Sequence, residues 1–268
     1  MKDIRIAMAV VSSAVGRIGA NLDAMHHWIG FARKKEADLI CFPEMNITGY
    51  GIKPGLMDIA RTLDDPVIGE IRDWAVKYRM VILTGMAEKD DQNQIFSTHL
   101  VITPNNTVGF YRKTHLGPPE RGMLTAGNKV PLFKVNGVTF GIQLCYDAHF
   151  PELSTRMALK GADVIFFPHA SPRGTSKEKM ASWMRHIPAR SFDNGIFTAA
   201  VNIVGSNGQD LNFPGTALAI NPSGQVIGSY AGNRQTCLIA DLSADELKKV
   251  RNHRMRYFLP HRRPELYG

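Results

Sequence analysis

The chain is poor in cysteine and has no long apolar run. Its 268 residues include three cysteines, Cys41, Cys145 and Cys237, and their spacing fits neither a disulfide framework nor a metal-binding motif. No apolar run approaches the roughly 20 residues that a membrane-spanning helix needs. The first residues lead directly into a strand-like run, so we expect no signal peptide. These absences predict a cytoplasmic protein with no membrane partner.

Acidic residues are also in short supply relative to basic ones. The chain has 24 Asp and Glu against 32 Lys and Arg, a formal net charge of +8. Such a charge can attract nucleic acid, but no zinc-finger or RNA-binding signature accompanies it, and we expect no nucleic-acid partner. Much of the excess lies near the end of the chain, at Lys248, Lys249, Arg251, Arg254, Arg256, Arg262 and Arg263. We expect this segment to be solvated or to dock a second subunit.

Strand-like and helix-like segments alternate along most of the chain. Strand-like runs occur at Ile4–Val11, Asp38–Phe42, Met80–Thr84, Asp163–Phe167, Ile196–Val201, Thr216–Ile220, Val226–Tyr230 and Cys237–Ile239. Helical patterns occur at Asn21–Lys35, from Asp65-Pro66 to Tyr78, after Pro151, after Thr175 and after Ser243. Between Ile95 and Leu144 the runs are short, and Asn136-Gly137 predicts a hairpin. This alternation predicts an α/β protein with two stacked sheets, in one domain over residues 1–268.

One predicted helix carries clear start and stop signals. Thr175 and Glu178 form a capping-box pattern. Behind them, an apolar stripe at helical spacing comprises Met180, Trp183, Met184 and Ile187. Pro188 should kink or interrupt this helix, because proline cannot continue the hydrogen-bond ladder.

Cys145 stands where an apolar strand ends and a helix is predicted to begin. Unpaired backbone N–H groups and a helix dipole at such a position lower a thiol pKa and favour the reactive thiolate. The same N–H groups can stabilise an oxyanion. A small buried core residue explains Cys145 equally well from this segment alone. Cys41 and Cys237 lie inside strand-like runs, where core packing is the expected role.

A nucleophile needs a base, and several side chains are candidates. His149 lies four residues after Cys145, but we expect it to bond the backbone or to face a substrate, because a base usually faces the thiol from across a cleft. Glu44 ends one buried strand and Lys113 ends another, which are the places where α/β proteins put active-site groups. A partly desolvated glutamate can act as a general base. No spacing rule joins these residues, and each is also compatible with a surface charge or a structural ion pair.

Taken together, three segments resemble the motifs of the nitrilase, or carbon–nitrogen hydrolase, superfamily. The first is Phe42-Pro43-Glu44 with Thr48-Gly49-Tyr50, the second is Arg112-Lys113-Thr114-His115-Leu116, and the third is Gly141-Ile142-Gln143-Leu144-Cys145-Tyr146-Asp147 with Phe150-Pro151-Glu152. The likeness extends over essentially the whole chain, including the ending from Arg262 to Tyr267. Three motifs in the family's order make the resemblance specific.

The resemblance implies a four-layer α-β-β-α sandwich, often paired into a homodimer or a larger homo-oligomer, and covalent catalysis without cofactor or metal. It implies that Glu44 takes the proton of Cys145, which attacks an amide, carbamoyl or nitrile carbon. Lys113 and the Tyr146 backbone N–H would hold the oxyanion. Glu120 matches a second glutamate of the family, which positions substrate or tunes the other charges.

The branch within the family is less constrained by the residues. Cys145-Tyr146-Asp147 is more similar to amidases and carbamoylases than to true nitrilases, so we expect a small amide or N-carbamoyl substrate, with a nitrile as the alternative. The arginines that some carbamoyl-amino-acid hydrolases place next are Ala148 and His149 here, and Arg173 is the candidate for an anion contact instead. Tyr50 and Tyr146 are candidate pocket walls. A non-catalytic binding protein on the same fold is a further alternative, against which the intact set of reactive residues argues.

Overall fold

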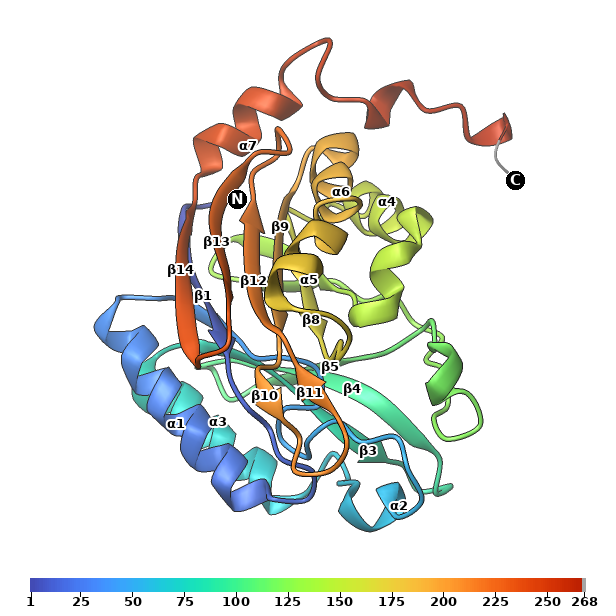
Figure 1. The fold of residues 1–268 in the computed structure, drawn as a ribbon. Coiled ribbons are helices and arrows are strands. Elements are labelled where there is room, and N and C mark those ends of the chain that lie inside the picture. Colours follow the sequence, from blue (N-terminus) through green and yellow to red (C-terminus); the bar gives the residue numbers. More distant parts are fainter. Residues whose placement is uncertain (267–268) are drawn as a thin grey trace.

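The computed structural model describes residues 1–266, so Tyr267 and Gly268, the last two residues of the predicted domain, lie outside the described residues. Two six-stranded sheets form its centre (Figure 1). In spatial order, the first comprises β14 (Thr236–Leu242), β1 (Ile4–Val10), β2 (Leu39–Cys41), β3 (Val81–Lys89), β4 (Ile95–Ile102) and β5 (Val108–Arg112). The second comprises β13 (Val226–Gly232), β12 (Gly215–Ile220), β9 (Phe197–Asn202), β8 (Val164–His169), β7 (Val138–Ile142) and β6 (Phe133–Val135). Two short strands, β10 (Gly205–Ser206) and β11 (Asn212–Phe213), pair separately.

Helices cover the outer face of each sheet (Figure 1). The first sheet is covered by α1 (Ile18–Lys34) and α3 (Pro66–Tyr78), and the second by α4 (Pro151–Leu159), α5 (Ser176–Trp183) and α6 (Ile187–Asn194). The shorter or peripheral elements are α2 (Leu56–Ile59), α7 (Ala244–Arg251) and the 3-10 turns Pro118–Glu120, Cys145–His149, Leu259–His261 and Pro264–Leu266. The layers therefore run helix, sheet, sheet, helix, and the expected α-β-β-α sandwich is confirmed.

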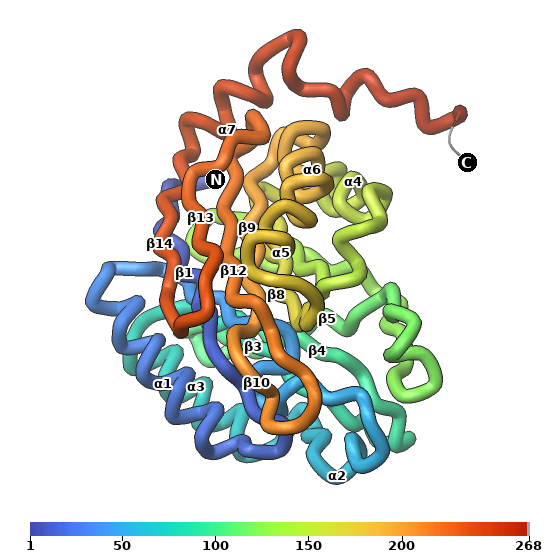
Figure 2. The backbone as a smooth tube through the Cα atoms, in the orientation of Figure 1, coloured from blue at the N-terminus to red at the C-terminus, as the bar shows by residue number. Residues whose placement is uncertain are grey.

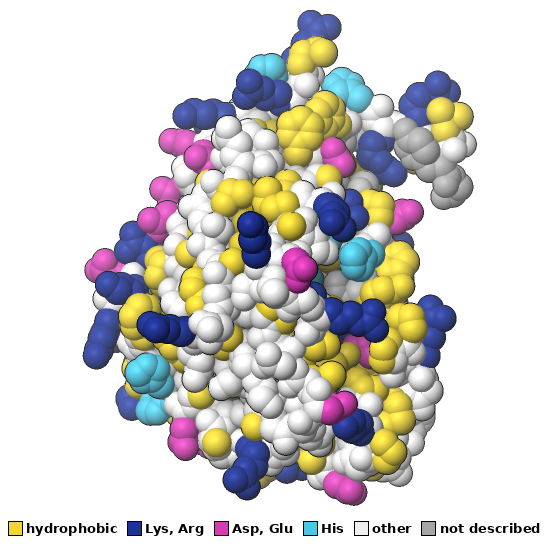
Figure 3. All heavy atoms as spheres, in the orientation of Figure 1, with side chains coloured by type: hydrophobic (Ala, Val, Ile, Leu, Met, Phe, Trp, Pro, Cys, Tyr) yellow, Lys and Arg dark blue, Asp and Glu magenta, His cyan; other side chains and the backbone are white. Residues whose placement is uncertain are grey.

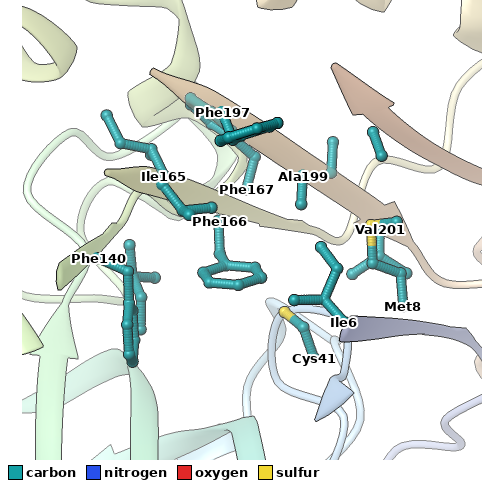
Figure 4. Packing of buried hydrophobic residues seen from close by; sticks show 14 of the residues in the cluster. Ile6, Met8, Cys41, Phe140, Ile165, Phe166, Phe167, Phe197, Ala199 and Val201 are labelled. Atoms are coloured by element: carbon teal, nitrogen blue, oxygen red, sulfur yellow. The ribbon is translucent and has the colours of Figure 1, made fainter. Parts of the chain in front are cut away.

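Strand β1 shows how the sequence builds these layers. Its side chains alternate, because successive residues of a strand point to opposite faces. Ile6 and Met8 belong to the apolar core between the sheets, together with Phe140 and Phe166 (Figure 4). Ala7 and Ala9 belong to a second core, which lies against α1 and α3. Small residues on that face allow the helices to pack closely on the sheet.

Most of the predicted starts and stops are confirmed. Thr175 accepts a hydrogen bond from the Glu178 backbone, and Glu178 reciprocates, as a capping box requires. The helix that follows ends at Trp183, and a new one begins at Ile187, so Pro188 interrupts it as expected. The hairpin at Asn136-Gly137 joins β6 to β7, with both turn residues at positive φ.

Three details differ from the expectation. Met184 is 42% exposed rather than part of the buried stripe, because the helix has already ended at that point. Helix α1 begins at Ile18, three residues before the predicted start, and no side chain caps it. Ser243 precedes α7 without a capping bond from its side chain, and the Ala244 N–H donates instead to Asp3 at 2.7 Å.

The C-terminal arm, residues 252–266, leaves α7 and runs across one end of the molecule (Figures 1 and 2). Its apolar residues include Met255, which is 75% exposed, and Leu266, which is 62% exposed. Lys and Arg are spread over the visible face as well as over the arm (Figure 3). None of the helices in residues 1–266 is long and apolar enough to cross a bilayer.

Candidate active site

Glu44 lies in a tightly held turn after β2. It is fully buried, and its Oε1 accepts hydrogen bonds from Ser97 Oγ and Lys113 Nζ, each at 2.9 Å. The turn is fixed by Asn46, whose Oδ1 accepts from the hydroxyl of Thr84 and the N–H of Gly85, both at 2.8 Å. Glu44 Oε2 is buried and has no hydrogen-bond partner among residues 1–266. One carboxylate oxygen is thus anchored and the other is left as an available acceptor.

Lys113 joins two carboxylates that are far apart in sequence. It follows β5 directly, and its N–H donates to the Ser97 carbonyl at 2.9 Å. Its ammonium, which is 1% exposed, contacts Glu44 Oε1 at 2.9 Å and Glu120 Oε1 at 2.6 Å. A buried ammonium with two carboxylates is held in one position, because each ion pair in a dry environment is strong.

Glu120 is fixed from both sides. Its Oε2 accepts from the Gly117 N–H at 2.6 Å, and its Oε1 accepts from the Tyr50 hydroxyl at 2.9 Å. The 3-10 turn Pro118–Glu120 follows Gly117, and its two prolines restrict the backbone. Tyr50 is therefore a buried partner of Glu120, and it is not among the residues that line the cavity at Cys145.

Cys145 follows β7 with its backbone in the left-handed region, at φ 44°. A residue other than glycine in this region carries about 1–3 kcal/mol of strain, which the surroundings must offset. Asp147 supplies much of that support. Its buried carboxylate accepts from the Leu144 N–H at 2.9 Å, from the His115 N–H at 2.8 Å and from the Tyr111 hydroxyl at 2.7 Å. Asp147 thus ties the turn that bears Cys145 to the segment that bears Lys113.

The pKa values at this site are governed by burial. Burial raises the pKa of Glu44 to about 7, against the lowering effect of Lys113 and with help from Glu120. Burial lowers the pKa of Lys113, but Glu44, Cys145 and Glu120 raise it more, so it stays protonated. Burial raises the pKa of Cys145 to about 12, and Lys113 only partly opposes this. The expectation of a lowered thiol pKa is wrong, because desolvation outweighs the local backbone.

A small cavity of about 130 Å³ opens at Cys145. Its walls come from the turn after β7, the end of β8 and helix α5, and they comprise Cys145, Tyr146, His149, His169, Ser171, Lys179, Ser182, Trp183 and His186. Tyr146, which the sequence predicted as a pocket wall, is one of the residues that line this cavity. His149 also lines the cavity, so it faces the space where a substrate would lie.

Six of the nine cavity residues were not predicted as site residues from the sequence: His169, Ser171, Lys179, Ser182, Trp183 and His186. Lys179, Ser182, Trp183 and His186 occupy positions i, i+3, i+4 and i+7 on and just beyond α5, a spacing that places them on one helix face. In the sequence this helix shows only an apolar stripe, of which Trp183 is a member. Arg173, the predicted anion contact, is exposed and does not line the cavity, although it is close enough to lower the pKa of Lys179.

The other cysteines lie elsewhere. Cys41 is fully buried in the core between the sheets (Figure 4), where burial raises its pKa far above the usual value. Cys237 packs against the core beneath α1 and α3. The expected packing role of both is consistent with these positions. A larger hollow of about 500 Å³, which Arg112 and Phe110 help to line, contains none of the three cysteines.

Comparisons with known proteins agree with the motifs. A family model described as carbon-nitrogen hydrolase matches residues 5–252. A probable nitrilase of Schizosaccharomyces pombe is 30% identical, over 98% of this chain and 96% of its own length. An (R)-stereoselective amidase of a Pseudomonas species is 29% identical, over 81% of this chain and 77% of its own.

Solved structures share the fold. The NitN amidase of Nesterenkonia sp. AN1 superposes with a TM-score of 0.84, at 24% identity and over 98% of both chains. Nit3 of Saccharomyces cerevisiae, described as a member of branch 10 of the nitrilase superfamily, superposes with a TM-score of 0.85, at 20% identity, over 96% of this chain and 97% of its own. At these identities the likeness speaks for the fold alone.

Proposed function

Since the chain belongs to the carbon–nitrogen hydrolase family of the nitrilase superfamily, we propose that it hydrolyses a small, non-peptide amide or N-carbamoyl compound through a thioester on Cys145. The proposed enzyme uses the whole chain, residues 1–268, as one domain. Glu44, Lys113, Glu120 and Cys145 are its proposed catalytic residues, without cofactor or metal.

The free Oε2 of Glu44 is the observation that carries this proposal. A buried carboxylate oxygen without a hydrogen-bond partner among residues 1–266 is costly, and such orphans tend to mark functional sites. With a pKa of about 7, Glu44 can both accept and return a proton near neutral pH. Besides burial, the charges of Lys113 and Glu44 shift the pKa of Cys145 in opposite directions, which supports a joint role for the three residues.

The reaction then follows from these groups. Because the resting thiol is protonated, Glu44 takes its proton as the sulfur attacks the carbonyl carbon. The new C–S bond leaves negative charge on the substrate oxygen, and Lys113 with the Tyr146 N–H stabilises it. The C–N bond breaks as ammonia or an amine leaves with the proton from Glu44. Water, activated by Glu44, then restores the thiol. It hydrolyses the thioester of an amide substrate to a carboxylic acid, and the thiocarbamate of a carbamoyl substrate to carbamic acid, which loses carbon dioxide.

The size of the cavity supports a small substrate. Its volume of about 130 Å³ lies below the roughly 300–1,000 Å³ of sites for drug-sized ligands. The NitN amidase of Nesterenkonia was solved with butyramide and with acrylamide, compounds of suitable size. Tyr146 is a proposed wall of this substrate site, and Tyr50 is proposed to act on substrate only through Glu120.

A nitrile is the second candidate substrate, because the relative from Schizosaccharomyces pombe is called a probable nitrilase. Its product would be the same acid, formed with ammonia but without a free amide. Two or more copies of the chain are also proposed to assemble, since the C-terminal arm exposes Met255 and Leu266. Arg173 stays a proposed anion contact at the edge of the site.

Replacing the proposed nucleophile tests the function. Wild-type protein should release ammonia from butyramide, and an electrophile such as fluoroacetamide should label Cys145, detected by peptide mass spectrometry. Cys145→Ala should lose both. Cys237→Ala is the matched control, because it removes a thiol outside the cavity. If Cys145 reacts no faster than Cys41 or Cys237, the proposal is wrong. Ammonia and acid from butyronitrile, but none from butyramide, would favour the nitrilase alternative.

A further inference from the structure

Lys179 is a buried cation without a countercharge. Lys179 is 8% exposed, and its ammonium donates a hydrogen bond to the hydroxyl of Ser171, which carries no charge. No carboxylate among residues 1–266 lies within ion-pair distance of it. An ammonium has three donors, and burying it unpaired is expensive. A charge kept in this state calls for a partner that is not part of the described chain.

The position of Lys179 tells where that partner would lie. Lys179 and Cys145 line the same small cavity. Burial lowers the pKa of Lys179, and the charge of a Cys145 thiolate would oppose that shift. The hydroxyl of Ser171 accepts the hydrogen bond from Lys179. Ser171 is itself fixed by Asn202, because the Ser171 N–H donates to Asn202 Oδ1 at 2.9 Å. The ammonium of Lys179 is therefore held near the proposed nucleophile by a hydrogen bond to a residue whose own position is fixed.

The other polar walls leave Lys179 as the cation of the cavity. Burial lowers the pKa of His186 to about 4, with help from His149 and Arg190, so its ring is neutral at pH 7. Burial, Arg190 and Lys179 lower the pKa of His149 as well. The two rings lie 4.7 Å apart, and His186 Nε2 is buried without a hydrogen-bond partner among residues 1–266. The cavity thus offers one positive charge and an unused imidazole nitrogen.

We infer that Lys179 binds a carboxylate of the substrate, while the amide carbon lies at Cys145. The substrate class is then a short amide or N-carbamoyl compound that carries a carboxylate a few atoms from the bond that breaks. A short spacer is required, because the cavity of about 130 Å³ is well below the roughly 300–1,000 Å³ of sites for drug-sized ligands. This inference rests on the proposed function.

Two amides of equal carbon count test it. Butyramide ends in a methyl group, whereas the monoamide of succinic acid ends in a carboxylate. Wild-type protein should have the higher kcat/KM for the monoamide. Lys179→Met, which keeps an unbranched side chain but removes the ammonium, should lower the ratio of the two kcat/KM values by about tenfold to a hundredfold. Lys179→Arg should keep most of the preference. Lys177→Met is the matched control, because Lys177 is exposed on the same helix and does not line the cavity.

A binding measurement separates this inference from the proposed function. Calorimetry with Cys145→Ala should detect the monoamide, and adding Lys179→Met should weaken its binding by a similar factor. Circular dichroism checks that both variants are folded. If butyramide is hydrolysed but Lys179→Met leaves the ratio and the binding unchanged, the inference fails and the proposed function stands. If neither amide is hydrolysed but the monoamide binds through Lys179, the proposed function fails and the carboxylate site stands.

Discussion

On one side of Cys145 the buried charges are paired, whereas on the other side the buried charge is alone. The proposed reacting side comprises Glu44, Lys113 and Glu120, whose ammonium and carboxylates contact one another at 2.6–2.9 Å. The proposed binding side comprises Lys179, His149 and His186, and no carboxylate of residues 1–266 lies within ion-pair distance of the Lys179 ammonium. Paired charges keep their positions through a reaction. A buried unpaired charge gains more free energy than a paired one when a ligand of opposite charge binds, so it is suited to recognising a ligand.

The largest effect should come from removing the base on the reacting side. Glu44→Gln keeps the shape of the side chain but cannot accept the thiol proton, so kcat/KM should fall by about 10²–10⁴. Butyramide and the succinic acid monoamide should be affected alike, because both need the same proton transfer. Steady-state ammonia release measures this.

Glu152→Gln is the control for that variant, since Glu152 is an exposed carboxylate at the start of α4. A loss confined to the charged amide would contradict the division of the site into a reacting side and a binding side.

Matched lysine substitutions should separate the two sides by stability. Lys113→Met leaves two buried carboxylates without a cation, which should cost about 3–5 kcal/mol in the free energy of unfolding. Lys179→Met removes a cation that has no carboxylate partner among residues 1–266 and should cost much less. Urea unfolding followed by tryptophan fluorescence compares them. Equal losses would mean that Lys179 has a structural partner after all.

A smaller effect, about tenfold per pH unit, is expected in the pH profile. Glu44 must be unprotonated to act as base, and its pKa is about 7. The kcat/KM for butyramide should therefore fall as the pH drops below about 7 and level off above it. His149→Gln should leave this midpoint in place, because the pKa of His149 is lowered by burial. A midpoint that moves with His149 would place the titrating group on the binding side.

The sequence predicted the sandwich and the approximate location of each strand-end residue. Pro188 and Asn136-Gly137 act through local backbone geometry, so their effects could be predicted locally. The contact between Lys113 and Glu44 joins residues 69 apart in the chain, and no spacing rule gives such a distance. Only the resemblance to a family brought them together before the structure did.

Two features of the site could not be predicted from the sequence, because they depend on how the layers pack. The pKa of Cys145 depends on how completely its surroundings exclude water, which outweighs the strand-to-helix position that the sequence displays. The helical spacing of Lys179 and His186 was visible in the sequence, but most lysines on a helix face water. Their importance lies in burial without a countercharge, a property of the assembled layers rather than of α5.

The left-handed backbone of Cys145 imposes a trade-off between durability and reactivity. Glycine adopts φ 44° without strain, so it would lower the conformational energy of this turn. It would also remove the thiol. The proposed nucleophile therefore stands where the backbone disfavours a side chain, and the hydrogen bonds of Asp147, two residues away, offset part of this strain. Selection for heat tolerance alone would therefore favour glycine at this position and would remove the activity. The hydrogen bonds of Asp147 reduce the gain in stability that glycine would bring.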